Sequence, residues 1–462
     1  MPRLHPSHRL AAVLAPAVLI LALAGAPAAL EGPLTLERAV RLALERSNGL
    51  RRLDNQVAQA RTSVSQARAQ SRPDLSLSVA PSERLGRTFE QSIGRVENQR
   101  SEGLSLRASS SLTLFNGFAN QAGVQAARLD LNASQQELRR GHQAVAYETV
   151  SRFLAVFSTA EVVRVRQQSV EAQKQQLARI RAYHEQGTRS RADVLQQEAS
   201  LASAELTLAD AQRSREVALL DLRQVLRLDL SEPLQPVAPD LAGPRQEPAA
   251  WDATGITREA LAERPDLEAQ RLRIDAARQQ LRRARATGLP ALSLSASGGT
   301  SYSSLNRISG FGEQLADLNP SASVGLSLSF SPFDQERTQS AVTSATLALR
   351  NAELTLESGE QDLARSIQQA VLDYSAAWQR RGAAQAQRAA AAEALAAMEA
   401  RYSTGAATFV ELSQTRALHV EAEATWVESA YALALARLAV AYHQGGQAWT
   451  AALGELTGLQ AP

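Results

Sequence analysis

An internal repeat constrains the fold of this 462-residue chain more than any other feature. Residues 44–50 resemble residues 261–267, and the correspondence continues without a gap to Pro73 and Pro290. Further along, Gly187 corresponds to Gly405, so the offset between the copies drifts by one residue over most of a half-chain. Self-similarity of this length is typical of a duplicated structural unit. We therefore predict two copies of one unit, each with the same order of secondary structure.

The composition around the two copies predicts their boundaries. A Pro-rich segment separates them, and prolines at that density cannot continue a helix. The N-terminus has a positively charged start, an apolar run over 10–24 and then small residues, which predicts a secretory signal peptide. The expected organisation is a signal peptide at 1–28, a first repeat at 29–230, a linker at 231–253, a second repeat at 254–445 and a C-terminal tail at 446–462.

Several function classes are excluded by composition. The chain has no cysteine, so disulfides, thiolate metal sites, catalytic thiols and an acylated N-terminal cysteine are excluded. Its 49 basic and 47 acidic residues are interspersed along helical segments, whereas a nucleic-acid partner requires a concentrated basic face. Zinc-protease, nucleophile-elbow and dinucleotide-loop motifs are also missing from the sequence. We expect no enzyme activity, no cofactor, no metal site and no nucleic-acid partner.

Each unit is predicted to begin with a helix and continue with two strands. The helices are expected at about 34–70 and 257–287, because Pro73 and Pro290 push the residues before them out of the helical region. Apolar residues then alternate with Ser, Thr and Ala at period two, which is typical of a strand. A polar loop separates the two strands of each unit. The residues expected on the apolar face are Leu75, Leu77, Leu104, Leu106, Leu112, Leu292, Leu294, Val324, Leu326 and Leu328.

The alternation has two interpretations. One is an antiparallel hairpin with one face on a core and the other in water. The other is a transmembrane barrel strand, apolar toward lipid and polar toward a lumen. The second is favoured because the polar face is almost all Ser and Thr, and because no further apolar layer remains in the chain to cover the strands. Four strands cannot close a barrel, so this interpretation requires several chains.

A long helical hairpin follows each strand pair. In the second copy the first helix of the hairpin is expected at about 334–402, on the order of 100 Å at the helical rise per residue. A narrow apolar stripe runs along it, from Leu356 through Ile367 to Trp378, which indicates a coiled coil or a helical barrel. The hairpins turn at Gly187 and Gly405, and the returning helices are expected at about 191–226 and 409–443.

At this point the sequence resembles the TolC-type outer-membrane efflux protein family over nearly all of the mature chain. The segments that carry the resemblance are 34–39, 73, 114–117, 187–195, 264–267, 290, 332–334 and 402–405. The resemblance implies a homotrimer with a 12-stranded β-barrel in the outer membrane and an α-helical tunnel across the periplasm. It also implies docking to a periplasmic adaptor and, through it, to a proton-driven or ATP-driven inner-membrane transporter.

The resemblance further implies a gate beside the hairpin tips. By position, the gate residues are Asp193, Glu411, Tyr402 and Gln414, and Gln414 departs from the acidic residue often found there. Three equivalent carboxylates around a narrow axis would favour cations. The other interpretation is that Asp193 and Glu411 are ordinary solvated helix charges. The tips that contact the adaptor are expected at Gly187, Thr188, Gly405 and Ala406.

A second function remains open at this level. Periplasmic adaptors and other coiled-coil scaffolds of export systems also contain helical hairpins, although they usually carry one hairpin within β-rich domains. The duplicated strand-and-hairpin unit favours the outer-membrane duct. The exported substrate is not indicated, and the lack of Cys and Met clusters gives no support for a soft-metal route.

Overall fold

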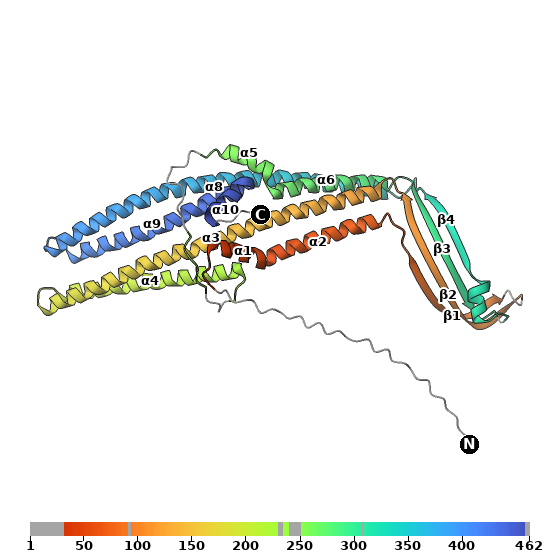
Figure 1. The fold of residues 1–462 in the computed structure, drawn as a ribbon, viewed down its shortest axis with the longest axis horizontal. Helices are drawn as coiled ribbons and strands as arrows, with labels where there is room; N and C mark the ends of the chain where they lie inside the picture. The colour runs from red at the N-terminus through yellow and green to blue at the C-terminus, as the bar shows by residue number, and fades with distance from the viewer. Residues whose placement is uncertain (1–31, 91–93, 230–233, 240–250, 307, 458–462) are drawn as a thin grey trace, which may run out of the picture.

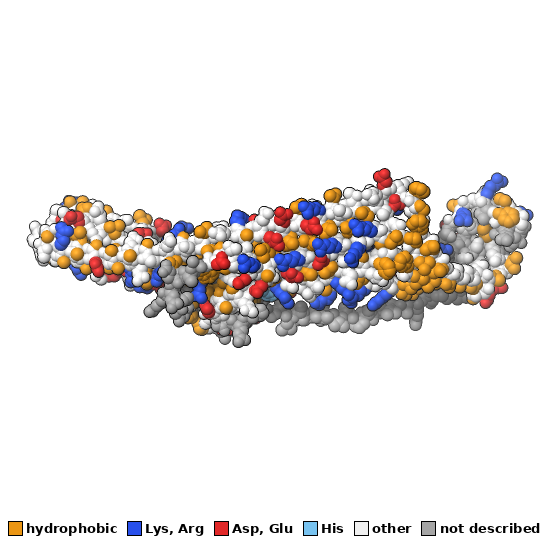
Figure 2. Space-filling view, turned by 90° about the horizontal axis from the view of Figure 1, so that it is seen from above, with side chains coloured by type: hydrophobic (Ala, Val, Ile, Leu, Met, Phe, Trp, Pro, Cys, Tyr) orange, Lys and Arg blue, Asp and Glu red, His pale blue; other side chains and the backbone are white. Residues whose placement is uncertain are grey.

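The protein is an elongated bundle of helices with a four-stranded sheet at one end (Figure 1). The computed structural model describes residues 32–90, 94–229, 234–239, 251–306 and 308–457. The expected signal peptide at 1–28 and most of the linker at 231–253 lie outside the described residues. Acidic and basic side chains alternate over the helical part (Figure 2), as the sequence indicates.

The two copies of the repeat have the same order of elements. The first copy comprises α1 (Leu36–Arg46), α2 (Asn48–Ala69), β1 (Ser76–Glu90), β2 (Arg95–Phe115), α3 (Ala119–Glu185) and α4 (Arg191–Leu226). The second comprises α5 (Ala253–Glu263), α6 (Pro265–Ala286), β3 (Ala291–Ser303), β4 (Ser321–Ser329), α8 (Arg337–Ser403) and α9 (Phe409–Gln444). A short helix α7 (Phe311–Glu313) and a π-helix η1 (Gln314–Leu318) lie between β3 and β4, and α10 (Gly446–Thr457) follows α9.

The prediction of one opening helix per copy was wrong, since each is two helices. In the first copy the chain leaves the helical conformation at Ser47, whose Oγ accepts from the backbone N–H of Leu50 at 3.3 Å and so caps α2. In the second copy the break is at Arg264, because Pro265 starts α6 and disfavours helical geometry in the residue before it. In each copy the second of the two helices, α2 or α6, runs to the sheet (Figure 1).

The sheet is antiparallel in the order β1-β2-β3-β4, and its register confirms the predicted two faces. Leu112 lies opposite Leu294, which lies opposite Leu326, so the apolar residues share one face. Serines meet on the other face, where the Oγ atoms of three pairs approach to 2.7, 3.0 and 2.9 Å: Ser76–Ser109, Ser293–Ser327 and Ser297–Ser323. We call these the leucine face and the serine face. The predicted first loop is mostly strand, because β1 and β2 stay paired out to Glu90 and Arg95.

The long helices pack along one another, as the apolar stripes predict. α3 and α8 each contain 67 residues, and α3 contacts α2, α4, α6 and α9. Ile367 and Tyr374 of the α8 stripe are buried, as are Thr149, Phe153 and Val156 at matching positions of α3. The returning helices α4 and α9 have 36 residues each and lie where the sequence places them.

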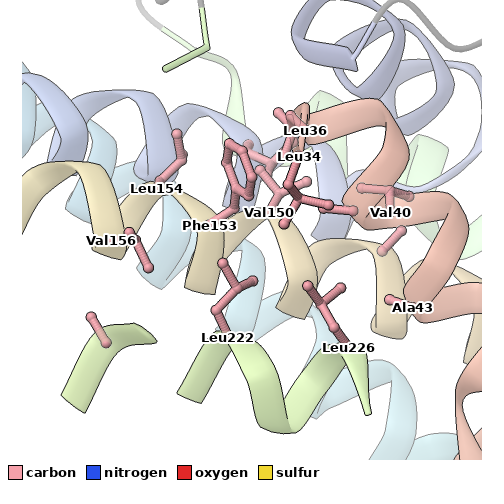
Figure 3. Close-up of a cluster of buried hydrophobic side chains, with 14 of the residues drawn as sticks. Leu34, Leu36, Val40, Ala43, Val150, Phe153, Leu154, Val156, Leu222 and Leu226 are labelled. Carbon is pink, nitrogen blue, oxygen red and sulfur yellow. The ribbon is translucent and has the colours of Figure 1, made fainter. Parts of the chain in front are cut away.

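The largest apolar core lies at mid-length in the bundle (Figure 3). There Leu36 of α1, Phe153 of α3 and Leu222 of α4 converge. Trp449 and Leu453 of α10 are buried in the same cluster, so the segment expected as a tail supplies part of the core. Within the described residues, none of the helices combines the length and the apolar character needed to cross a membrane.

Candidate functional site

The two hairpin tips share one turn geometry. In the first, the Gly187 N–H donates to the His184 carbonyl at 2.9 Å and the Thr188 N–H to the Tyr183 carbonyl at 2.9 Å. The second tip repeats this pattern, with Gly405 donating at 3.2 Å and Ala406 at 2.9 Å. These bonds satisfy the last carbonyls of α3 and α8. The glycines have φ of 74° and 77°, which side chains with a Cβ rarely adopt, and the four tip residues are exposed.

The two acidic gate candidates cap the returning helices. Asp193 accepts from the Ser190 N–H at 3.2 Å, and Glu411 accepts from the Thr408 N–H at 2.7 Å, each in a capping box. The Thr408 backbone and hydroxyl lower the pKa of Glu411, so its carboxylate is charged at neutral pH. Glu411 is exposed and Asp193 is half-buried, and each belongs to a different hairpin.

Tyr402 joins the two hairpins beside the tips. The Arg189 guanidinium of the first hairpin lies over the Tyr402 ring, 4.7 Å from its centroid. The Phe409 ring packs edge-on at 6.3 Å. Burial raises the pKa of the Tyr402 phenol, and Asp193 adds to this shift while Arg189 opposes it. The structure thus brings Tyr402 and Asp193 into one electrostatic neighbourhood, whereas Gln414 lies exposed on α9. The sequence places Arg189 beside the first tip, but it does not indicate that Tyr402 of the other hairpin is its partner.

A buried ionic cluster at the start of α6 was missed by sequence reasoning. Arg264 is only 8% exposed, and its Nε donates to Asp266 at 2.9 Å while Nη1 donates to the His443 carbonyl at 3.2 Å. Arg140 donates to the Tyr442 carbonyl at 3.3 Å and lies 3.9 Å from the centroid of that ring. The two arginines thereby satisfy carbonyls at the C-terminus of α9. Burial, reinforced by these two cations, lowers the pKa of His443 to about 4.

Exposed apolar side chains surround the junction between the sheet and the helices. Phe115, Phe330 and Phe333 are 40%, 55% and 96% exposed. Phe118 packs edge-on against Phe115 at 5.4 Å, and Leu289 is half-exposed nearby in the other copy. Hydrophobic side chains gather at this junction in the space-filling view (Figure 2). On the leucine face, edge-strand residues such as Leu77 and Val324 are 76% and 77% exposed.

The described residues form exposed surfaces that could contact other molecules, together with a helical framework that positions those surfaces. Among them, no three His, Asp or Glu side chains gather in a group that could hold a metal ion. The conspicuous features are instead an exposed apolar band on a four-stranded sheet and two paired helical tips at the opposite end (Figure 1).

Comparison with known proteins identifies the family. The profile of outer membrane efflux proteins matches residues 39–226 and 256–446, which together span most of both repeats. The chain belongs to the outer membrane efflux protein family. It is 26% identical over 286 residues to the outer membrane efflux protein BepC of Brucella suis, an alignment that covers 62% of this chain and 58% of BepC. It is 27% identical over 348 residues to protein CyaE of Bordetella pertussis, covering 74% of this chain and 70% of CyaE.

A solved structure has the same fold. A membrane protein from Pseudomonas aeruginosa superposes with a TM-score of 0.78 at 19% identity, covering 89% of this chain and 92% of that one. The predicted resemblance to the TolC-type family is therefore confirmed, together with the predicted class of fold. Membership places the protein in the outer membrane with its helices in the periplasm, in a family of trimeric, non-enzymatic channels.

Proposed function

We propose that this efflux protein is the outer-membrane exit duct of a tripartite efflux or type I secretion system. It works as a passive homotrimeric channel, coupled to an inner-membrane transporter through a periplasmic adaptor. The observation that carries the proposal is the leucine face of the sheet, which bears no charged strand residue over 76–82, 103–113, 291–303 and 321–329. Its edge strands are exposed, and it lies at the opposite end of the chain from the hairpin tips. Family membership favours this duct over the adaptor or scaffold that the sequence left open.

The sheet edges support the oligomer. Among the described residues of one chain, β1 pairs only with β2 and β4 pairs only with β3, so both outer edges of the sheet leave backbone N–H and C=O groups without strand partners. Such groups are costly in lipid, where only closed barrels satisfy them. Three copies supply twelve strands, an even number within the range of outer-membrane barrels. The exposed phenylalanines at the sheet–helix junction suit the aromatic girdle at a membrane interface.

The faces and ends of the chain have distinct roles in the proposed duct. The leucine face contacts outer-membrane lipid, through Leu75, Leu77, Leu104, Leu106, Leu112, Leu292, Leu294, Val324, Leu326 and Leu328. The exposed tips, at Gly187, Thr188, Gly405 and Ala406, meet the adaptor. Glu411, Asp193, Tyr402 and Gln414 form the periplasmic constriction. Because hydrogen bonds keep the Glu411 carboxylate ionised, three copies of it would favour cations.

Conductance in planar bilayers tests the gate separately from helix capping. Glu411→Gln removes the charge but keeps a side chain that can complete the capping box. We expect this variant to lower the cation-to-anion permeability ratio, while Glu393→Gln, an exposed change in the C-terminal third of α8, leaves the ratio unchanged. An unchanged ratio in Glu411→Gln would leave Glu411 with its capping role alone.

The duct itself is tested by location and assembly. The mature protein should fractionate with the outer membrane, migrate as a heat-resistant trimer and open aqueous pores in a bilayer. Recovery as a monomer in the soluble or inner-membrane fraction would contradict the proposal.

A further inference from the structure

We propose that Arg107 places a ring of positive charge inside the barrel and makes the outlet selective for anionic groups. The inference rests on the proposed function, because it needs three chains with their serine faces turned toward a common lumen. The four-stranded part of the sheet comprises residues 76–82, 103–113, 291–303 and 321–329. Within these described residues, Arg107 is the single charged side chain on either face.

The strand register places Arg107 on the serine face. It pairs with Ser78 on β1 and with Gly299 on β3. Its neighbours on the same face along β2 are Ser105 and Ser109, two residues away in each direction. Arg107 is therefore surrounded by hydroxyl groups and backbone, without a carboxylate beside it.

The pairing with glycine leaves room for the guanidinium. A Cβ at Gly299 would lie 3.8 Å from the Arg107 Cβ and 2.7 Å from the Leu106 carbonyl oxygen, so any larger residue would crowd this point of the sheet. On the other side, the Ser78 hydroxyl donates to the Arg107 carbonyl at 3.5 Å and is too short to cover the side chain. The Arg107 side chain is accordingly exposed.

The nearest opposite charge on this face is too distant to neutralise Arg107. Asp74 accepts from the Ser111 hydroxyl at 2.9 Å, and Ser111 is four residues from Arg107, about 13 Å along a strand. That exceeds the Debye length of about 8 Å at physiological salt. The acidic residues of α7 and η1 belong to the other face, because the Thr300 hydroxyl donates to the Leu315 carbonyl at 2.8 Å and the Tyr302 ring packs on Phe311.

An unneutralised guanidinium on an otherwise uncharged wall sets the local sign of the potential. Three copies around a lumen would attract anions and repel cations in the same way as basic rings in anion-selective pores. Arginine also binds carboxylate, phosphate and sulfate groups through its planar fork of donors. Arg107 would thus act on anionic groups of exported molecules at the far end of the duct from Glu411.

Reversal potentials in a KCl gradient test the sign of this charge. Arg107→Gln should raise the potassium-to-chloride permeability ratio by roughly twofold or more, because a unit charge within a Debye length changes the local concentration of an ion in water by about that factor. Arg107→Glu should raise it further. The matched control is Arg87→Gln, which removes the same charge from β1 on the opposite face, outside the four-stranded part, and should leave the ratio unchanged.

Thiol chemistry gives an independent test, because the chain has no cysteine of its own. In Arg107→Cys channels, a membrane-impermeant cationic thiol reagent should restore the wild-type permeability ratio and an anionic reagent should raise the ratio. Leu106→Cys, on the adjacent residue and the leucine face, should resist both reagents. If wild-type channels conduct but the Arg107 variants and reagents leave the ratio unchanged, the ring is refuted and the duct stands. If wild-type protein forms no pore, both proposals fail.

Discussion

Lowering the pH from 7 to 5 should weaken folding of this protein through one residue, His443. The imidazole lies at the C-terminus of α9 beside Arg264 and Arg140, and burial together with these two cations lowers its pKa from 6.5 to about 4. Protonation places a third positive charge in a partly buried site. The folded state therefore binds the proton less readily than the unfolded chain does.

The direction and size of the effect follow from linkage. A histidine with a depressed pKa favours folding above its unfolded pKa, and this stability is lost as the pH falls from about 6.5 toward 4. At pH 5 the unfolded chain is almost fully protonated at this position while the folded chain is mostly neutral. The difference amounts to about 2 kcal/mol per chain relative to pH 7.

Thermal unfolding in detergent, followed by circular dichroism at pH 7 and pH 5, measures this loss. At an unfolding entropy of about 2.1 cal/mol/K per residue, 2 kcal/mol corresponds to a Tm decrease of roughly 2 °C in a chain of this size. His443→Gln removes the titration but keeps every carboxylate, so the pH response of the wild type minus that of the variant isolates His443. Equal Tm decreases in the two proteins would refute the reasoning.

Two further predictions concern the fold. Gly405→Ala should destabilise the hairpin by about 1–2 kcal/mol, because a φ of 77° strains any residue with a Cβ. Gly382→Ala within α8, where a Cβ meets nothing within 4 Å, should stabilise the protein by about 0.5–1 kcal/mol. The denaturation midpoints of the two variants should shift in opposite directions, and shifts of the same sign would contradict this. Arg264→Gln should cost about 3 kcal/mol, the low end for breaking a buried ion pair, because the Asp266 side chain is 34% exposed. A double-mutant cycle with Asp266→Asn should then give strong coupling, and additive losses would show that the pair is not the source of the stability.

Much of the architecture could be predicted from local sequence signals. The predicted span of α4 agrees with Arg191–Leu226, because glycine ends the preceding helix and Ser190 caps the next one. The two strand faces also follow directly from period-two alternation. Local signals did not predict the structure where a continuous helical pattern and a capping residue occur in the same segment. The opening helix of the first copy has an unbroken helical pattern, yet Ser47 breaks it by capping α2.

The candidate site was predicted less completely. The hairpins turn at Gly187 and Gly405 as expected, since turn chemistry involves residues within a few positions of one another. The capping role of Asp193 and Glu411 was not predicted, and their place in a gate stays a prediction. The contact of Arg189 with Tyr402, and that of Arg264 with His443, join residues about 200 positions apart. Neither pair has a recognisable spacing.

The sequence by itself determined the duplication, the order of strands and hairpins, the faces of the strands and the positions of the turns. These features depend on periodicity and on short-range hydrogen bonds, which act within one element. Only the tertiary structure decided which charges are buried, which arginine stacks on Tyr402, and that α10 completes the mid-length core. Those outcomes depend on how rigid helices dock against one another, and a small change in axial position would bring different side chains into contact.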